Sequence, residues 1–187
     1  MGASNSIQNI NFTYHPTKAL GVLGYILSEL GGKTDFHKIF KIIYFADQRH
    51  LVDYGRPITG DYFVAMNNGP VPSNIYDVFK RMRKNISDPS DVFHEYFYAE
   101  GQYYIVLKSK PDATFLSKSD IECLDISIKE NKDLDFNALT RKSHDNAYNS
   151  SDHNSEINFY YIAQAGGANE DTLKYISTIS ENQAIKL

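Results

Sequence analysis

Residues 41–80 read KIIYFADQRHLVDYGRPITGDYFVAMNNGPVPSNIYDVFK, and the glycine and proline residues of this signature segment set where its elements end. Gly55 is expected to end an apolar helix, because glycine readily adopts the left-handed backbone that follows a helix, and Pro57 keeps the helix from resuming. A second turn, around Gly69, separates a short strand from a new helix. The signature segment is thus expected to form a helix, a strand and a helix joined by two rigid turns.

Helical periodicity extends outward from the signature segment in both directions. Leucines spaced three and four residues apart predict a helix from Pro16 to the Gly31-Gly32 pair. Thr34 is the expected N-cap of the next helix, whose two apolar faces place it at the centre of the fold. The polar run 143–155 is expected to be an exposed loop. Further helices are predicted over residues 74–84, 116–131, 134–141, 159–163 and 168–179.

Strand-forming residues are few. Residues 92–98 and 103–107 are rich in aromatic and β-branched side chains and predict a β-hairpin, and a short strand is predicted over 61–66. The expected fold class is α+β and mostly helical, with six to seven helices and one small three-stranded antiparallel sheet. Residues 15–187 are expected to form one domain, after a flexible N-terminus over 1–14.

The composition is typical of a folded protein in a reducing compartment. Hydrophobic residues make up 42% of the 187, which is enough to bury a core. The net charge of −4 argues against non-specific binding to nucleic acid, which requires a basic surface. A single cysteine, Cys123, cannot form an intramolecular disulfide, and no apolar run reaches the roughly 18 residues that cross a bilayer. A cytoplasmic location and no membrane partner are therefore expected.

No combination of residues predicts a catalytic site, so neither an enzyme nor a cofactor is expected. The Gly-x-Ser-x-Gly elbow of serine hydrolases is absent. His144, Asp145 and His153 are residue types that could hold a divalent metal for a hydrolase. Their stretch lacks the helical spacing that would bring three ligands together, so no metal is expected and the metal-dependent hydrolase remains an alternative.

A basic cluster at the end of the third predicted helix raises a second alternative, a DNA-binding regulator. Such a cluster can contact phosphates. It equally complements the negative end of a helix dipole, which is the simpler interpretation. The cluster consists of Lys80, Arg81, Arg83 and Lys84.

The two rigid turns carry residue types that recognise other proteins. Tyr54 and Arg56 flank the first turn, and Asp61 follows closely enough to pair with Arg56. Asn67 and Asn68 form the second turn. Because rigid loops often carry binding residues, and because Tyr and Arg dominate many interfaces, these five residues are the expected contacts with a protein partner. The alternative is that the turns only join their elements tightly.

Several motifs of the chain resemble the Panacea domain family, which includes SocA-like antitoxins and phage-associated GepA-like proteins. Residues 139–144 and 157–176 also resemble later segments of that family. One departure is the missing tryptophan, since Ala147-Tyr148 stands where the family commonly has it. The motifs within the signature segment are Tyr44, Ala46, His50 and Leu51, then Tyr54–Ile58, then Gly69–Pro72.

The resemblance implies a bacterial or phage antitoxin. Such a protein would bind a toxin, usually the product of the adjacent gene, and would neutralise it directly or by delivering it to a protease. The resemblance implies no catalytic residues. Some relatives carry an additional helix-turn-helix module, for which this chain has no room, so a nucleic-acid partner is not expected.

Overall fold

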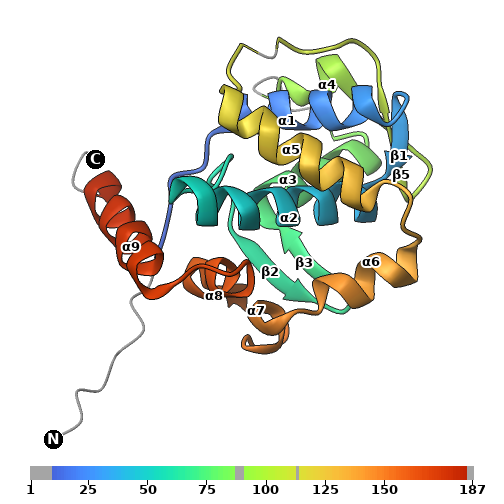
Figure 1. Cartoon of the computed structure of the whole chain (residues 1–187). Coiled ribbons are helices and arrows are strands. Elements are labelled where there is room, and N and C mark those ends of the chain that lie inside the picture. The colour runs from blue at the N-terminus through green and yellow to red at the C-terminus, as the bar shows by residue number, and fades with distance from the viewer. Residues whose placement is uncertain (1–9, 87–90, 113, 185–187) are drawn as a thin grey trace, which may run out of the picture.

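The computed structural model describes residues 10–86, 91–112 and 114–184, which form nine helices and two small sheets (Figure 1). The α+β class, dominated by helices, is as predicted, but the described residues form nine helices where six to seven were expected, because short segments such as α4 and α7 are helical as well. The helices are α1 (Pro16–Glu29), α2 (Phe36–Tyr54), α3 (Ser73–Arg83), α4 (Phe93–Tyr96), α5 (Lys118–Asn131), α6 (Phe136–Ser143), α7 (Asn146–Asn149), α8 (Phe159–Ala165) and α9 (Glu170–Ala184). The strands are β1 (Lys33–Asp35), β2 (Phe63–Met66), β3 (Gly69–Pro72), β4 (Phe97–Glu100), β5 (Tyr104–Leu107) and β6 (Glu156–Ile157).

Helix α2 occupies the centre of the fold, as its two apolar faces predict. Helices α1 and α5 lie on one side of it, and β2 and β3 lie on the other (Figure 1). Its N-cap is Asp35, whose carboxylate accepts a hydrogen bond of 2.9 Å from the backbone nitrogen of Lys38. Thr34, the expected cap, lies instead in β1. Gly55, at φ 74°, ends the helix as predicted.

The strands form two sheets, so the prediction of a single sheet is wrong. One sheet has the order β1-β5-β4 and the other the order β3-β2-β6, and every pairing is antiparallel. The 69–72 segment is a strand, although Pro70 and Pro72 favour a turn. An edge strand tolerates proline because one side of its backbone needs no hydrogen-bond donor.

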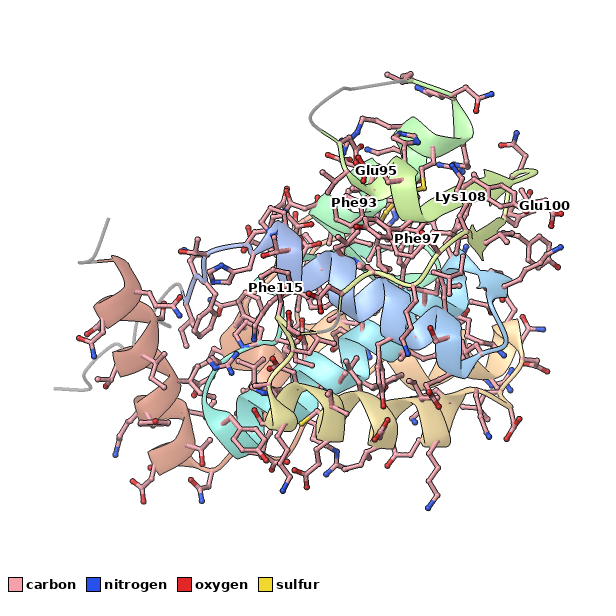
Figure 2. All side chains as sticks on the ribbon, turned by 90° about the horizontal axis from the view of Figure 1, so that it is seen from above. Phe93, Glu95, Phe97, Glu100, Lys108 and Phe115 are labelled. Atoms are coloured by element: carbon pink, nitrogen blue, oxygen red, sulfur yellow. The ribbon has the colours of Figure 1, made fainter. Side chains whose placement is uncertain are left out.

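Two short helical segments also differ from the prediction. Residues 93–96 form one turn, α4, before β4 begins, and the predicted loop 143–155 contains α7. Phe93 and Phe97 point into the core, whereas Glu100 lies at the outer end of the β4–β5 hairpin (Figure 2).

The segment 10–14 is packed against the domain, which corrects the expected flexible N-terminus for these residues. Ile10 is buried, and the ring of Phe12 meets that of Phe159 edge-to-face at 5.2 Å. Asn11 exchanges two hydrogen bonds with the hydroxyl of Ser180 on α9, at 3.0 and 2.7 Å. Residues 1–9 lie outside the described part of the chain.

Candidate functional site: an aromatic groove at the start of α2

At its C-terminal end, α2 contributes to a buried ion-pair cluster that is centred on Asp120 of α5. His50 Nε2 lies 3.1 Å from the Asp120 carboxylate and the Arg56 guanidinium lies 3.5 Å from it, while Lys18 donates a hydrogen bond to its other oxygen. Burial alone would raise the pKa of Asp120, but the hydrogen bonds from His50 and Lys18 hold it well below its usual range. The cluster therefore fastens α1, α2 and the first turn to α5.

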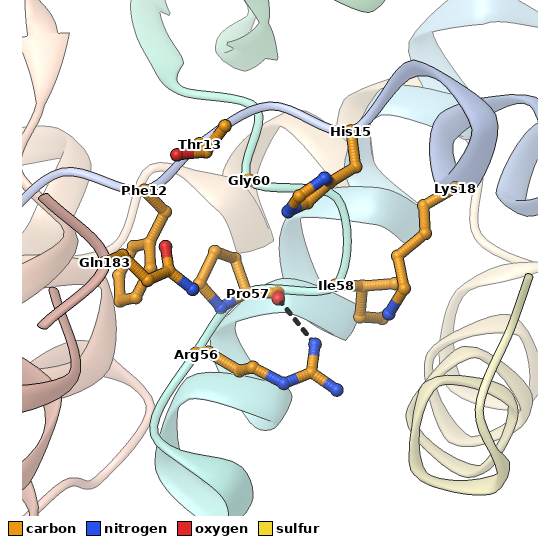
Figure 3. Close-up of a pocket in the computed structure, with 9 residues that line it drawn as sticks. All are labelled: Phe12, Thr13, His15, Lys18, Arg56, Pro57, Ile58, Gly60 and Gln183. Carbon is orange, nitrogen blue, oxygen red and sulfur yellow. Dashed lines mark hydrogen bonds between the residues drawn. The ribbon is translucent and has the colours of Figure 1, made fainter. Parts of the chain in front are cut away.

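The first turn offers only a small pocket. It has a volume of about 250 Å³ and is lined by His15, Lys18 and Arg56 among others (Figure 3). The Arg56 guanidinium donates to the carbonyl of Pro57 at 3.2 Å, as well as facing Asp120. Tyr54 is 39% exposed, its ring lies 4.7 Å from that of His50, and its hydroxyl donates to Glu122. Both predicted contacts at this turn are therefore occupied by neighbours within the domain.

Asp61 does not pair with Arg56, which corrects that prediction, and it is fully buried. Its carboxylate accepts hydrogen bonds from the backbone nitrogens of Asn74 and Ile75, at 3.0 and 2.9 Å, and one of 2.8 Å from the Asn74 side chain. These nitrogens belong to the first turn of α3, where backbone donors lack partners within the helix. Asp61 thus satisfies the first backbone donors of α3 and, because it is buried, cannot touch a partner protein.

Asn67 and Asn68 lie at the other end of α2. The backbone carbonyl of Asn68 is 3.2 Å from His37 Nε2 in the first turn of α2, whereas Tyr54 ends that helix. At 1.5 Å per residue these two ends are about 25 Å apart. The five predicted contact residues therefore do not form one site.

A groove of about 760 Å³ opens where Asn67 and Asn68 lie. Three of its aromatic side chains are well exposed, namely Tyr103 (71%), Phe136 (50%) and Tyr104 (46%). We call this feature the aromatic groove. Its aromatic lining comprises Phe36, Phe40, Tyr76, Tyr103, Tyr104 and Phe136, and its polar lining includes Asp35, His37, Lys41, Asn67, Asn68, Arg83 and His153.

Contacts between separate segments hold the rim of the aromatic groove in place. The Phe136 ring stacks on that of His37, with their centres 4.1 Å apart. His153 Nε2 lies 2.6 Å from the Asn67 side-chain oxygen, which ties the β2–β3 turn to the segment before β6. The backbone nitrogen of Phe36 donates to the carbonyl of Tyr103, which holds the β4–β5 turn beside α2.

Sequence reasoning missed most of this lining. The aromatic groove joins the start of α2, the β2–β3 turn, α3, the β4–β5 turn and the start of α6, and no short-range pattern brings these together. The available signals were weak: Tyr103-Tyr104 borders the turn of a predicted hairpin, and Phe136 follows Asp135, which caps α6.

The Lys, Arg and Asp side chains that line the aromatic groove are Lys41, Arg83 and Asp35. The Arg83 guanidinium carbon lies 5.3 Å from the centre of the Phe36 ring and 5.9 Å from that of Tyr76. Lys41 lies buried at the floor, and burial lowers its pKa to about 7. Among the described lining residues Asp35 supplies the carboxylate, and that group is engaged as the cap of α2.

The three residues of the metal alternative serve other purposes. Asp145 caps α7 and accepts hydrogen bonds from the Tyr44 hydroxyl, the closer at 2.9 Å, while the His144 ring stacks on that of Tyr148 at 4.1 Å. His153 lies at the rim of the aromatic groove. Within the described ranges, no three His, Cys, Asp or Glu residues are grouped so that they could hold a metal ion.

The basic cluster of the DNA-binding alternative is divided among separate partners. Lys80 pairs with Asp77 on the same helix, and Arg81 binds Asp91 at 2.8 Å. Arg83 turns toward the aromatic groove. The cluster thus presents little continuous positive surface for a phosphate backbone.

Comparison with known families agrees with the expected resemblance. The family model described as antitoxin SocA-like, Panacea domain, matches residues 39–149. Searches of curated proteins and of solved structures gave no match. None of the helices in the described ranges is both long enough and apolar enough to cross a membrane. Since the family model covers more than half of the chain, this protein belongs to the SocA-like antitoxin family of Panacea domains.

Proposed function

We propose that this protein is an antitoxin that binds a toxin protein through the aromatic groove and thereby neutralises it. Membership of an antitoxin family supports the role. The aromatic groove is the proposed binding surface because Tyr103, Tyr104 and Phe136 are exposed around it. Contiguous exposed aromatic area is unusual on a monomer and typical of the centre of protein interfaces.

We infer binding rather than catalysis, because the polar groups of the aromatic groove are arranged as structural contacts. His37 bonds to Asn68 and Thr140, and His153 bonds to Asn67. Burial lowers the pKa of His37 to about 4, which makes it a weak general base toward the Thr140 hydroxyl 3.1 Å away, and His153 lies against an amide oxygen. The proposal therefore includes no reaction and no cofactor, and the lone buried Cys123 suits the cytoplasm as the place of action.

Co-expression with the product of the adjacent gene tests the proposal. That product should stop growth when expressed alone, and this protein should restore growth and co-purify with it. Replacing Tyr103 and Phe136 by serine should abolish both effects. Tyr175→Ser is the matched control, because Tyr175 is another well-exposed tyrosine (56%) and lies against Gly55 at the opposite end of α2.

Two outcomes would contradict the proposal: a neighbour that is harmless by itself, or rescue of growth without a complex. Repeating the rescue in a strain that lacks the main energy-dependent proteases separates the two modes of neutralisation. Direct inhibition persists in that strain, whereas delivery to a protease does not.

A further inference from the structure

We propose that the aromatic groove binds an extended acidic segment of its partner, in which a carboxylate that pairs with Arg83 stands next to an aromatic or large aliphatic side chain. The inference rests on the proposed function for the identity of the partner as a toxin. The chemistry of the bound segment follows from the aromatic groove alone.

The apolar part of this preference comes from the floor of the aromatic groove. Phe36, Phe40 and Val71 are almost fully buried yet line it, so each presents a small apolar area at its base. Tyr103, Tyr104 and Phe136 stand above them as exposed walls. An aromatic or large aliphatic side chain entering between these rings would remove apolar surface from water on both partners, which favours binding.

The acidic part comes from Arg83. Its guanidinium lies over two rings, Phe36 and Tyr76, which restricts its position before any partner arrives. Among the described residues no carboxylate forms an ion pair with it. A planar guanidinium held in this way can bind a carboxylate with two parallel hydrogen bonds, and less side-chain entropy is lost on binding.

Electrostatics reinforces the same choice. The whole chain carries a net charge of −4, yet the aromatic groove contains Arg83 and the buried Lys41, while the Asp35 carboxylate is already bonded to the backbone of Lys38. The Arg83 guanidinium, which has no ion-pair partner among the described residues, attracts an acidic segment and repels a basic one.

Nucleic acid fits the aromatic groove less well, although bases also stack on aromatic rings. A single strand needs a row of cations to follow its phosphates. Here the neighbouring cations Lys80 and Arg81 are paired with Asp77 and Asp91. One arginine suits one carboxylate better than it suits a chain of phosphates.

A peptide selection tests the inference without requiring a toxin. A display library of random short peptides is selected on the immobilised full-length protein, and parallel selections use Arg83→Gln and the control Lys84→Gln. Lys84 is the adjacent exposed residue at the end of α3. The wild type and Lys84→Gln should enrich sequences that combine Asp or Glu with aromatic or large aliphatic residues, and Arg83→Gln should not.

Synthetic peptides then identify the pairing group. Arg83→Gln should weaken binding of the selected acidic peptide about tenfold. It should weaken binding of the same peptide with Asn or Gln in place of its Asp or Glu less than about twofold. Circular dichroism and urea unfolding should match the wild type for every variant. The inference is overturned by enrichment of basic sequences, by an absence of enrichment over Arg83→Gln, or by a uridine oligonucleotide that binds in the aromatic groove more tightly than the peptides do.

The two proposals fail separately. If the protein neutralises its neighbour but Arg83→Gln and Tyr103→Ser do so equally well, the groove inference is wrong and the antitoxin role stands. If acidic peptides bind as expected but the neighbour is harmless, the antitoxin role is wrong and the groove chemistry stands.

Discussion

The buried ammonium of Lys41 on α2 donates a hydrogen bond of 2.8 Å to the backbone carbonyl of Pro70 on β3. This bond joins the helix of the signature segment to its second turn. Gly69, at φ 96°, lies beside it, and a Cβ there would meet Ser143 Oγ and would lie 2.9 Å from Lys41 Nζ. The lysine and the glycine thus belong to one tightly packed junction beneath the aromatic groove.

Lys41 should make stability depend on pH in the alkaline range. Burial lowers its pKa to about 7 in the folded state, whereas an unfolded lysine titrates near 10.4. Between these values the unfolded chain binds more protons, so the free energy of unfolding rises with pH, by at most about 1.4 kcal/mol per unit. Urea unfolding at several pH values should show this slope for the wild type and not for Lys41→Met. Equal slopes for the two proteins would contradict the assignment.

Gly69→Ala should destabilise the protein by about 2 kcal/mol or more, because it combines an unfavourable positive φ with a steric clash. Gly101→Ala is a matched control. Gly101 also has a positive φ, of 62°, but nothing lies within 4 Å of its would-be Cβ, so its cost should be about 1 kcal/mol. Urea midpoints of the two variants measure the difference, and equal losses would show that packing at Gly69 contributes nothing.

Asp61→Ala should cost about 2 kcal/mol, since it removes the acceptor for two backbone donors at the start of α3. Asp61→Asn keeps one acceptor oxygen and should lose less. Thermal unfolding followed by circular dichroism gives both values. A loss of toxin binding by Asp61→Asn at unchanged stability would instead place Asp61 in the interface, contrary to its burial.

Asp120→Asn should destabilise by about 2 kcal/mol or more at pH 7, because it removes the buried carboxylate that Lys18 and Arg56 share, although both cations keep partial access to water. The exposed Asp133→Asn is the control and should change little. The pKa of Asp120 is lowered in the fold, so its contribution is present above about pH 4, the unfolded value, and is lost at lower pH. The difference in the free energy of unfolding between the wild type and Asp120→Asn should therefore become smaller as the pH is lowered. A difference that stays constant with pH would contradict the pairing.

The sequence predicts the parts of the fold that depend on neighbouring residues. The α2 helix and its end at Gly55 follow from local chemistry. The strands β1 and β3 were missed because each is short and becomes a strand only by pairing with a segment elsewhere in the chain, Lys33 with Val106 for example.

The candidate site was predicted only in part, for a related reason. Asn67 and Asn68 were identified because a rigid turn carries them. Tyr103 and Phe136 were not, because in a sequence an exposed aromatic residue looks the same as one that fills the core. Asp61 was misassigned because its role depends on the backbone nitrogen of Asn74, which only the folded chain brings close to it.

The pair of hydrogen bonds between Asn11 and Ser180 has a practical consequence for transplanting this domain. Both residues lie outside the stretch 39–149 that carries the family likeness. A fragment trimmed to that stretch would lose α1 and the buried Ile176 of α9, and it would expose the core they cover. The smallest fragment that keeps the fold must therefore include both Asn11 and Ser180. A fusion partner should be attached before the first of these residues or after the second.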